Sequence, residues 1–269
     1  MGNCCGGARE KSTYQGNSIK ARREQTWHAT GTIALRDSNL KELPRSVAAV
    51  GSDAKVLDAT NNRLREVIYI ETLVNLQRLI LARNQISELP ASISTLQSLK
   101  VLNVESNSIH ALPEQIGALT KLERLQIASN ALISLPGSFV RLQGLKVLSL
   151  ARNKFATVPD EIGACSRLEE LDLSDNCLQE LPESLGRLQS LKVLAADQNR
   201  ISRVAPAIFR GCSSLQTLAL HENPMTIEEL QATEGYDLLE ARRRKKFDKQ
   251  IGTGALVGSM DEGISRAVR

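Results

Sequence analysis

Apolar and polar positions follow one repeating pattern along most of the chain. Residues 99–119, LKVLNVESNSIHALPEQIGAL, show the unit, whose fixed positions read L-x-x-L-x-V-x-x-N-x-I-x-x-L-P-x-x-I-x-x-L. The asparagine of this unit recurs every 23 residues, with steps of 22 and 24 at the two ends. The recurring residues are Asn62, Asn84, Asn107, Asn130, Asn153, Asn176, Asn199 and Asn223. A period of this length predicts a stack of similar coils.

Each unit predicts one turn of a solenoid. The segment L-x-x-L-x-L predicts a short strand with its leucines inside, and the return segment supplies a second apolar row that meets them. We expect the asparagine amide to bond backbone groups of its own coil and of the adjoining one. Proline fixes φ where the return begins, at Pro44, Pro90, Pro113, Pro136, Pro159 and Pro182. The predicted fold is α/β, with a curved parallel sheet on the concave face and short helices or 3-10 turns on the convex face.

Breaks in the pattern divide the chain into four parts. Residues 1–29 are polar and precede the repeats, residues 30–224 hold nine repeats, and residues 251–269 are small and polar. Residues 225–250 predict a helical cap, with a capping box at Thr226-x-x-Glu229 and a second helix opened by Asp237-x-x-Glu240. Trp27 is expected to cover the first repeat. Leu238 and Leu239 are expected to cover the last one.

Composition narrows the class of protein. The chain has 269 residues, 42% hydrophobic and 3% aromatic, which suits one elongated soluble domain. No apolar run approaches the roughly 18 residues of a membrane span, and no secretory signal is visible. Cys165, Cys177 and Cys212 are expected to be buried thiols rather than disulfides or zinc ligands. We expect no cofactor and no metal, and a cytoplasmic location.

The first residues carry a candidate lipid anchor. Met1-Gly2 opens a myristoylation signal, and the neighbouring Cys4 and Cys5 are of the kind that accepts palmitate, although Gly6 departs from the usual Ser or Thr. One myristoyl chain binds membranes only marginally, with an association constant of about 10⁴ M⁻¹, so a second signal matters. The alternative is a polar tail with accidental cysteines.

A run of five cations lies in the C-terminal cap: Arg242, Arg243, Arg244, Lys245 and Lys246. Such a run could serve as a nuclear localisation signal, a nucleic-acid patch, a second membrane contact or merely a solvated face. The whole chain has a net charge of +4, but its positive charge gathers at the two ends. The repeats between them are net acidic, which argues against nucleic acid as a partner.

The outward positions of the strands predict a protein-binding face. These positions favour arginine in repeats three to six and acidic residues in repeats seven to nine: Arg78, Arg83, Glu105, Arg124, Gln126, Arg152, Glu170, Asp172, Asp175, Asp197, His221 and Glu222. Nine strands span roughly 40 Å, which suits a protein more than a metabolite. The alternative is that these are only solvated strand faces. The oligomeric state is left open.

No catalytic set is visible, so we expect no enzyme. The three histidines, His28, His110 and His221, fall in different contexts, and no serine and acid can be tied to any of them. Two alternatives to a signalling scaffold stay open. One is a regulatory subunit of a small GTPase or a protein phosphatase, and the other is a soluble nuclear or cytosolic factor.

The L-P-x-x-I spelling, as in Leu112-Pro113-Glu114-Gln115-Ile116, resembles the intracellular leucine-rich repeat class. That class includes Ras-binding scaffolds and the plant intracellular Ras-group-related proteins. The layout is also similar to that of the small animal leucine-rich repeat-containing protein fifty-seven, because Met1-Gly2-Asn3 opens the chain and Glu234-Gly235-Tyr236-Asp237 precedes a basic helix. The resemblance implies a leucine-rich repeat solenoid and a non-catalytic signalling adaptor.

Overall fold

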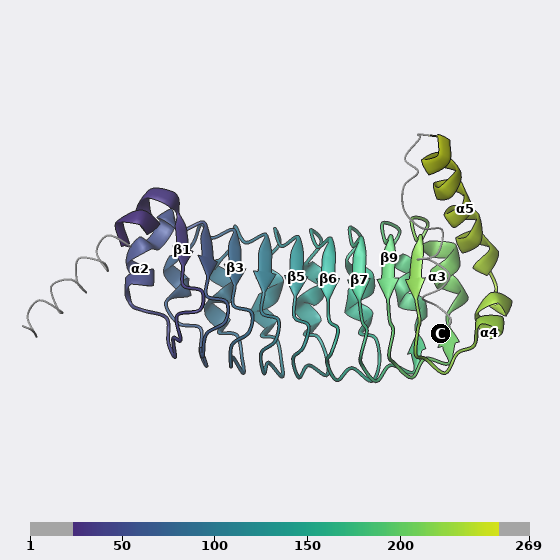
Figure 1. Cartoon of the computed structure of the whole chain (residues 1–269), viewed down its shortest axis with the longest axis horizontal. Coiled ribbons are helices and arrows are strands. Elements are labelled where there is room, and N and C mark those ends of the chain that lie inside the picture. The colour runs from purple at the N-terminus through teal and green to yellow at the C-terminus, as the bar shows by residue number, and fades with distance from the viewer. Residues whose placement is uncertain (1–23, 253–269) are drawn as a thin grey trace, which may run out of the picture.

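The fold is a single stack of coils, described here from a computed structural model (Figure 1). The structure describes residues 24–252, without the side chains of residues 246–252. Nine parallel strands form one sheet in chain order, with one short pair inserted elsewhere. The strands are β1 (Thr32–Ala34), β2 (Val56–Asp58), β3 (Arg78–Ile80), β4 (Val101–Asn103), β5 (Arg124–Gln126), β6 (Val147–Ser149), β7 (Glu170–Asp172), β9 (Val193–Ala195) and β11 (Thr217–Ala219).

Each strand is three residues long and buries only its middle residue. Leu102 of β4, for example, lies in register between Leu79 of β3 and Leu125 of β5, and all three are fully buried. The residues on either side of the buried leucine face outward because side chains alternate along a strand. One row of leucines therefore lines the core, and two rows of outward residues line the concave face.

The opposite side of each coil carries a short helix or 3-10 turn. Pro113 precedes one such turn with φ −70° and ψ 149°, an extended conformation that proline adopts readily. In the eighth repeat the proline is displaced by one position, and Pro206 there begins an α-helix instead. The elements are α2 (Ser46–Val50), η1 (Gly51–Asp53), η2 (Ile70–Thr72), η3 (Ala91–Thr95), η4 (Glu114–Ala118), η5 (Gly137–Arg141), η6 (Asp160–Ala164), η7 (Glu183–Arg187) and α3 (Pro206–Gly211).

The predicted α/β leucine-rich repeat solenoid is thus confirmed, with one addition. A second parallel pair joins β8 (Glu180–Leu181) to β10 (Arg203–Val204). It lies beyond the asparagine turn, where the repeat pattern alone predicts no strand.

Cysteines take the place of leucines in the core. Cys165 and Cys212 are buried at the ends of the turns in repeats six and eight, where other repeats place a leucine such as Leu119. Burial raises the pKa of Cys165 to about 12 and that of Cys212 to about 11. Cys177 is only half-buried, which corrects the expectation that all three thiols are buried. All three are free thiols.

Helices cover both ends of the stack (Figure 1). Residues 24–30 are helical at the first end, where Trp27 is buried in the core. At the other end lie α4 (Ile227–Ala232) and α5 (Tyr236–Gly252), and α4 has the predicted capping box between Thr226 and Glu229. Within residues 24–252, no helix has the length and apolar character needed to cross a membrane.

The second cap helix differs from the prediction. It begins at Tyr236, so Asp237 lies in its first turn and does not precede it. The carboxylate of Glu240 accepts hydrogen bonds from the Tyr236 hydroxyl and from Arg243. Leu239 is buried, whereas Leu238 is 41% exposed, so the prediction that both leucines cover the last repeat was wrong for Leu238.

Candidate protein-binding surface

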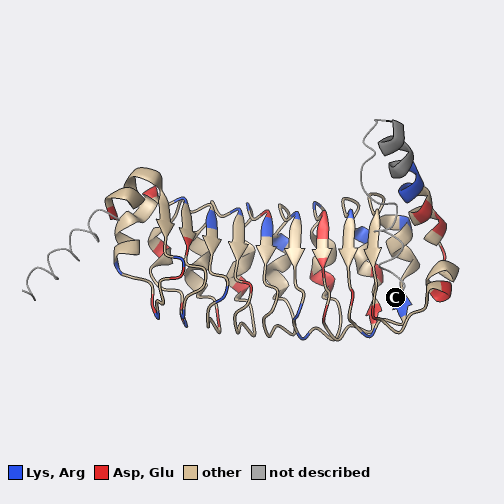
Figure 2. Cartoon of the chain, in the orientation of Figure 1, with Lys and Arg blue, Asp and Glu red and all other residues tan. Residues whose placement is uncertain are grey.

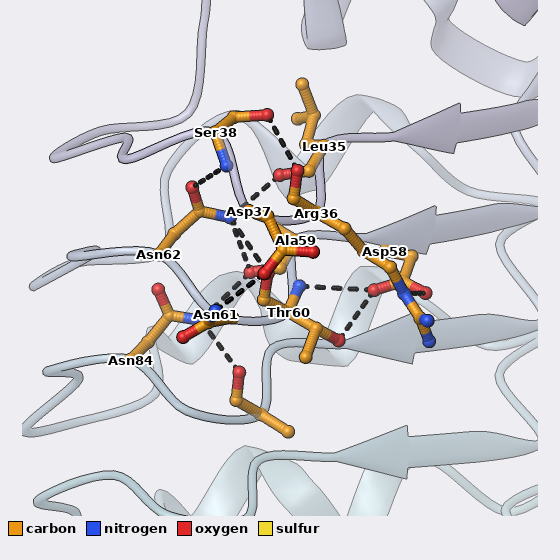
Figure 3. A network of polar contacts seen from close by, with 11 residues as sticks. Leu35, Arg36, Asp37, Ser38, Asp58, Ala59, Thr60, Asn61, Asn62 and Asn84 are labelled. Atoms are coloured by element: carbon orange, nitrogen blue, oxygen red, sulfur yellow. Dashed lines mark hydrogen bonds and ion pairs between the residues drawn. The ribbon is translucent and has the colours of Figure 1, made fainter.

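The asparagine ladder holds each coil to the one before it. Asn107 donates from Nδ2 to the carbonyl oxygens of Leu81 at 3.0 Å and Val104 at 2.9 Å, and its Oδ1 accepts the backbone N–H of Ile86 at 3.0 Å. Leu81 and Ile86 belong to the preceding repeat. Figure 3 shows the same arrangement at Asn62 and Asn84, which lie one above the other. The ladder therefore keeps the outward rows in fixed alignment.

The residue before each ladder position has left-handed backbone. Its φ lies between 52° and 57° in all nine coils, at Asp37, Asn61, Arg83, Ser106, Ser129, Arg152, Asp175, Gln198 and Glu222. Non-glycine residues adopt this conformation infrequently, and Asn and Asp do so most readily. Here the tight turn after each strand imposes it. The repeated conformation aligns these side chains in a column beside the sheet.

The twelve residues predicted for the concave face lie on neighbouring columns of one surface. Strand register places Arg78, Arg124 and Glu170 in one row, and Gln126 and Asp172 in the next. The others follow the strands at two successive positions: Glu105, Asp197 and His221 at the first, and Arg83, Arg152, Asp175 and Glu222 at the second. In Figure 2 blue lies on β3 and β5 and red on β7, so positive charge precedes negative along the sheet.

At the N-terminal end of this surface, the charged and polar side chains bind one another. Arg36 Nε donates to Asp58 Oδ2 at 2.6 Å, and Asp58 Oδ1 accepts the Thr60 hydroxyl at 2.7 Å. Asn61 Nδ2 donates to Asp37 Oδ1 at 2.6 Å. Figure 3 shows these residues as one network that links the first two coils. Sequence reasoning missed it, and the signal was there, because the partners are 22 and 24 residues apart, about one repeat.

At its C-terminal end the polar groups are also engaged. Asp197 Oδ1 accepts the backbone N–H of His221 at 2.6 Å, and Gln198 Nε2 donates to Glu222 Oε2 at 2.8 Å. His221 Nε2 lies 3.4 Å from Glu222 Oε1. The first two contacts join the last two coils, and the third lies within the last coil.

The middle of the surface is different. The side chains of Arg78, Arg83 and Arg124 are exposed, and they make no hydrogen bond or ion pair with any other residue that the structure describes. Glu170 is likewise exposed and Glu105 is half-buried, and neither carboxylate makes a hydrogen bond or ion pair with a residue that the structure describes. Arg152, by contrast, is paired, because its Nε lies 3.4 Å from Asp175 Oδ2. Unpaired charges on repeats three to seven can therefore bind a partner without first breaking an internal contact.

Alternating charges also line the edge where the strands begin. Lys146 Nζ lies 2.8 Å from Glu123 Oε2, and Lys192 Nζ lies 2.5 Å from Glu169 Oε2, each across one coil. The hydrogen bond and the positive charge of the lysine hold the pKa of each glutamate below its usual range. Both pairs are exposed, so their contribution to stability is small.

The members of the basic run in the C-terminal cap differ in their contacts and exposure. Arg242 Nη2 donates to the carbonyl oxygen of Phe209 at 2.6 Å, and Arg243 Nε donates to that of Gln216 at 3.1 Å. Both side chains are half-buried, while Arg244 and Lys245 are exposed. The side chain of Lys246 lies outside the described part of the chain. Two of the five cations therefore fasten α5 to the last coils.

One histidine and one carboxylate come together unexpectedly. His28 Nδ1 lies 3.1 Å from Asp53 Oδ2 at the edge of an open hollow of about 400 Å³, which Ser52 and Ser98 also line. This corrects the view that no histidine, serine and acid share one place. Within the described chain, however, no hydroxyl hydrogen-bonds to the His28 ring, and both members of the pair are exposed.

No group of three or more possible metal ligands occurs within residues 24–245. The proposed lipidation residues Gly2, Cys4 and Cys5 lie outside the described residues.

Comparisons with known proteins agree with this geometry. The family model described as "Leucine-rich repeat region" matches residues 54–154 and 136–261. A leucine-rich repeat protein of Leptospira interrogans superimposes with a TM-score of 0.72 at 31% identity, over 78% of this chain and 59% of that one. The plant peptide hormone receptor RGFR1 in complex with RGF2 superimposes with a TM-score of 0.59 at 26% identity, over 68% of this chain and 30% of that one.

Two plant proteins are similar along most of their length. The LRR repeats and ubiquitin-like domain-containing protein of Arabidopsis thaliana is 57% identical over 254 residues, which are 93% of this chain and 68% of that one. Plant intracellular Ras-group-related LRR protein 7 of rice (Oryza sativa subsp. japonica) is 59% identical over 247 residues, 91% of this chain and 94% of that one. The resemblance seen in the sequence is thereby confirmed: the chain belongs to the plant intracellular Ras-group-related leucine-rich repeat family.

Proposed function

We propose that this protein is a non-catalytic scaffold that binds a protein partner on its concave face. The observation that carries the proposal is the set of unpaired charges on repeats three to seven, between two ends whose polar groups are already engaged. Unpaired arginine on an exposed, rigid surface suits recognition of carboxylate groups. Charges of both signs at fixed places favour one orientation of the partner.

The comparison with RGFR1 supports a binding role for this fold. That peptide hormone receptor, whose structure superimposes on this chain, is observed in complex with RGF2. Solenoids of this kind present extended concave surfaces to their partners. Our proposal for this chain is a binding role on that concave surface, with a partner of its own.

Charge reversal tests the binding face. We would compare the proteins that co-purify from a plant extract with the wild type, with R78E/R124E and with R141E/R187E. Arg141 and Arg187 are exposed arginines in the turns η5 and η7, so the second pair changes the charge equally on the opposite side. Loss of a partner with R78E/R124E alone supports the proposal. Equal retention of every partner by both variants contradicts it.

We propose in addition that lipids hold the scaffold at the cytoplasmic face of a membrane. Gly2 would carry myristate, and Cys4 or Cys5 would carry palmitate as the second signal that stable anchoring requires. Intact mass and membrane partition of the wild type and of Gly2→Ala, both from a eukaryotic host, test this. We expect an added myristoyl group, and release of the variant to the soluble fraction. A wild type that is unmodified and soluble would contradict the lipid anchor, and the proposal would then be a scaffold that is not attached to a membrane.

The alternative of a nuclear role loses one of its supports. It rested on five consecutive cations, of which Arg242 and Arg243 bond backbone carbonyls of the last coils. We therefore do not adopt it.

A further inference from the structure

We infer that the partner segment is an amphipathic α-helix that lies along the sheet, with acidic side chains facing Arg78 and Arg124 and a basic one facing Glu170. This inference rests on the proposed function, because it names the kind of partner that the concave face takes. It comes from the order of residues along a single row of the sheet.

That row alternates between charge and valine. From β3 to β9 the register gives Arg78, Val101, Arg124, Val147, Glu170 and Val193, each opposite the next. The three valines are half-buried, whereas the charged residues between them are exposed. A ligand that crosses the strands therefore meets a cation, an apolar side chain, a second cation, another apolar side chain, an anion and a third apolar side chain.

The spacing of the row suits a helix. Neighbouring strands lie about 4.8 Å apart, and an α-helix advances about 5.4 Å per turn. A helix that crosses the strands thus presents about one turn to each strand, and residues three or four positions apart share its facing side. Six strands correspond to about 18 residues of helix.

An extended peptide fits the row less well. Its side chains on one face recur every two residues, about 6.6 Å apart. That repeat falls between one and two strand spacings. Successive side chains of an extended peptide therefore do not line up with the charged residues, which lie two strands apart. The row therefore favours a helical ligand over an extended one.

A displayed peptide library provides the test. The probe is a library of helix-forming peptides of about 18 residues, with the six facing positions varied among Glu, Lys, Leu and Ala. A second library carries the same residues with interspersed prolines that prevent helix formation. Both are selected against the wild type, R78E/R124E and the control R141E/R187E, after circular dichroism has shown that each variant is folded.

We expect the wild type and the control to enrich helical peptides that carry Glu at the first and eighth positions and Lys at the fifteenth. R78E/R124E should instead enrich Lys at the first two of these positions. The best wild-type peptide should bind R78E/R124E at least about tenfold more weakly, and exchange of its two Glu for Lys should restore binding to that variant.

Three outcomes would overturn the inference: enrichment only from the proline library, the same peptides from all three proteins, or no preference at the charged positions. In each case the helical partner is rejected. The proposed concave-face function is judged separately, because the co-purified partner either still depends on Arg78 and Arg124 or does not.

Discussion

Asn153 donates a hydrogen bond from Nδ2 to the carbonyl oxygen of Ile127, one coil before its own, at a distance of 3.1 Å. Its Oδ1 accepts the backbone N–H of Leu132, in that same earlier coil, at 3.0 Å. Because Asn153 is buried, water cannot replace these bonds. Asn153 Nδ2 also donates to the carbonyl oxygen of Leu150 in its own coil at 3.0 Å. One side chain thus closes the turn of its own coil and joins it to the previous one.

Loss of this side chain should cost stability. Asn153→Ala leaves the backbone N–H of Leu132 without a partner and removes one of the two side-chain hydrogen bonds to the carbonyl oxygen of Ile127. We therefore expect the free energy of unfolding to fall by about 1–3 kcal/mol. Urea denaturation measures the change. The control is Asn103→Ala, since Asn103 is half-exposed and its Oδ1 bonds only to the backbone of Glu105 in its own coil. Equal losses for the two variants would contradict the role assigned to the ladder.

The left-handed column predicts a dependence on side-chain shape. Ser129 has φ 57°, and a β-branched residue there clashes with the backbone. We expect Ser129→Val to lower the free energy of unfolding by about 1–2 kcal/mol, and Ser129→Gly to be close to neutral. The control Ser149→Val lies on β6, where valine is favoured. Tolerance of valine at both positions would show that the turn can relax.

Glycines between neighbouring turns predict a steric effect. A Cβ on Gly163 would lie 2.6 Å from the carbonyl oxygen of Ser184 in the next coil, whereas a Cβ on Gly137 meets nothing within 4 Å. Gly163→Ala should therefore lower the melting temperature by several degrees, for a cost of about 1–3 kcal/mol. Gly137→Ala should leave it unchanged or raise it slightly. Similar melting temperatures for the two variants would argue against tight stacking of η6 on η7.

Buried thiols predict a loss of stability in alkali. The pKa of Cys165 is raised to about 12 and that of Cys212 to about 11, from an ordinary value of 9.0, because burial disfavours the thiolate. Between pH 9 and these values the unfolded chain holds fewer protons than the folded one, so stability falls as pH rises. Below pH 9 the two thiols contribute no pH dependence.

Unfolding by urea at a series of pH values measures this effect. The double variant C165A/C212A should lose less stability across the alkaline window than the wild type, even though its overall stability is lower. In the native protein at pH 8, alkylation should reach the half-buried Cys177 before Cys165 and Cys212. Parallel alkaline slopes in wild type and variant would contradict the assignment.

The C-terminal cap depends on Arg242. Arg242→Ala removes the bond to the carbonyl oxygen of Phe209, so α5 should open more often and exchange its amide hydrogens at least about tenfold faster. Arg244→Ala, on the exposed part of the same run, should leave exchange unchanged. Hydrogen-exchange mass spectrometry distinguishes the two. Equal exchange in both variants would mean that other contacts hold the helix.

Most of the fold could be predicted because each coil of the solenoid is specified by residues close together in the sequence. One period places the leucine of each strand, the asparagine of each turn and the proline of each return. The structure expected for one repeat therefore applies to the other repeats. The exceptions depend on contacts between elements that are far apart in the sequence but adjacent in space. The pair β8–β10 and the burial of Leu239 rather than Leu238 are set by packing against adjacent coils, which the period does not encode.

The candidate surface was predicted in outline only. Spacing alone places Arg78 and Arg124 on one row, but it cannot tell which charges are already paired. Arg36 and Asp58, about one repeat apart, form a close pair, and Arg242 turns towards the backbone of Phe209. The sequence shows charges, whereas the geometry shows which of them stay available.

The most direct test of the central claim is site-specific photo-crosslinking from opposite sides of two neighbouring coils. A photoreactive residue would replace Val147, on β6 of the concave face, or Val140, which is 40% exposed in η5 on the opposite side. We predict a discrete crosslink to one partner protein from position 147 in plant cells, and none to that protein from position 140. Crosslinks of equal yield from both positions, or from position 140 alone, would contradict a scaffold that binds through its concave face.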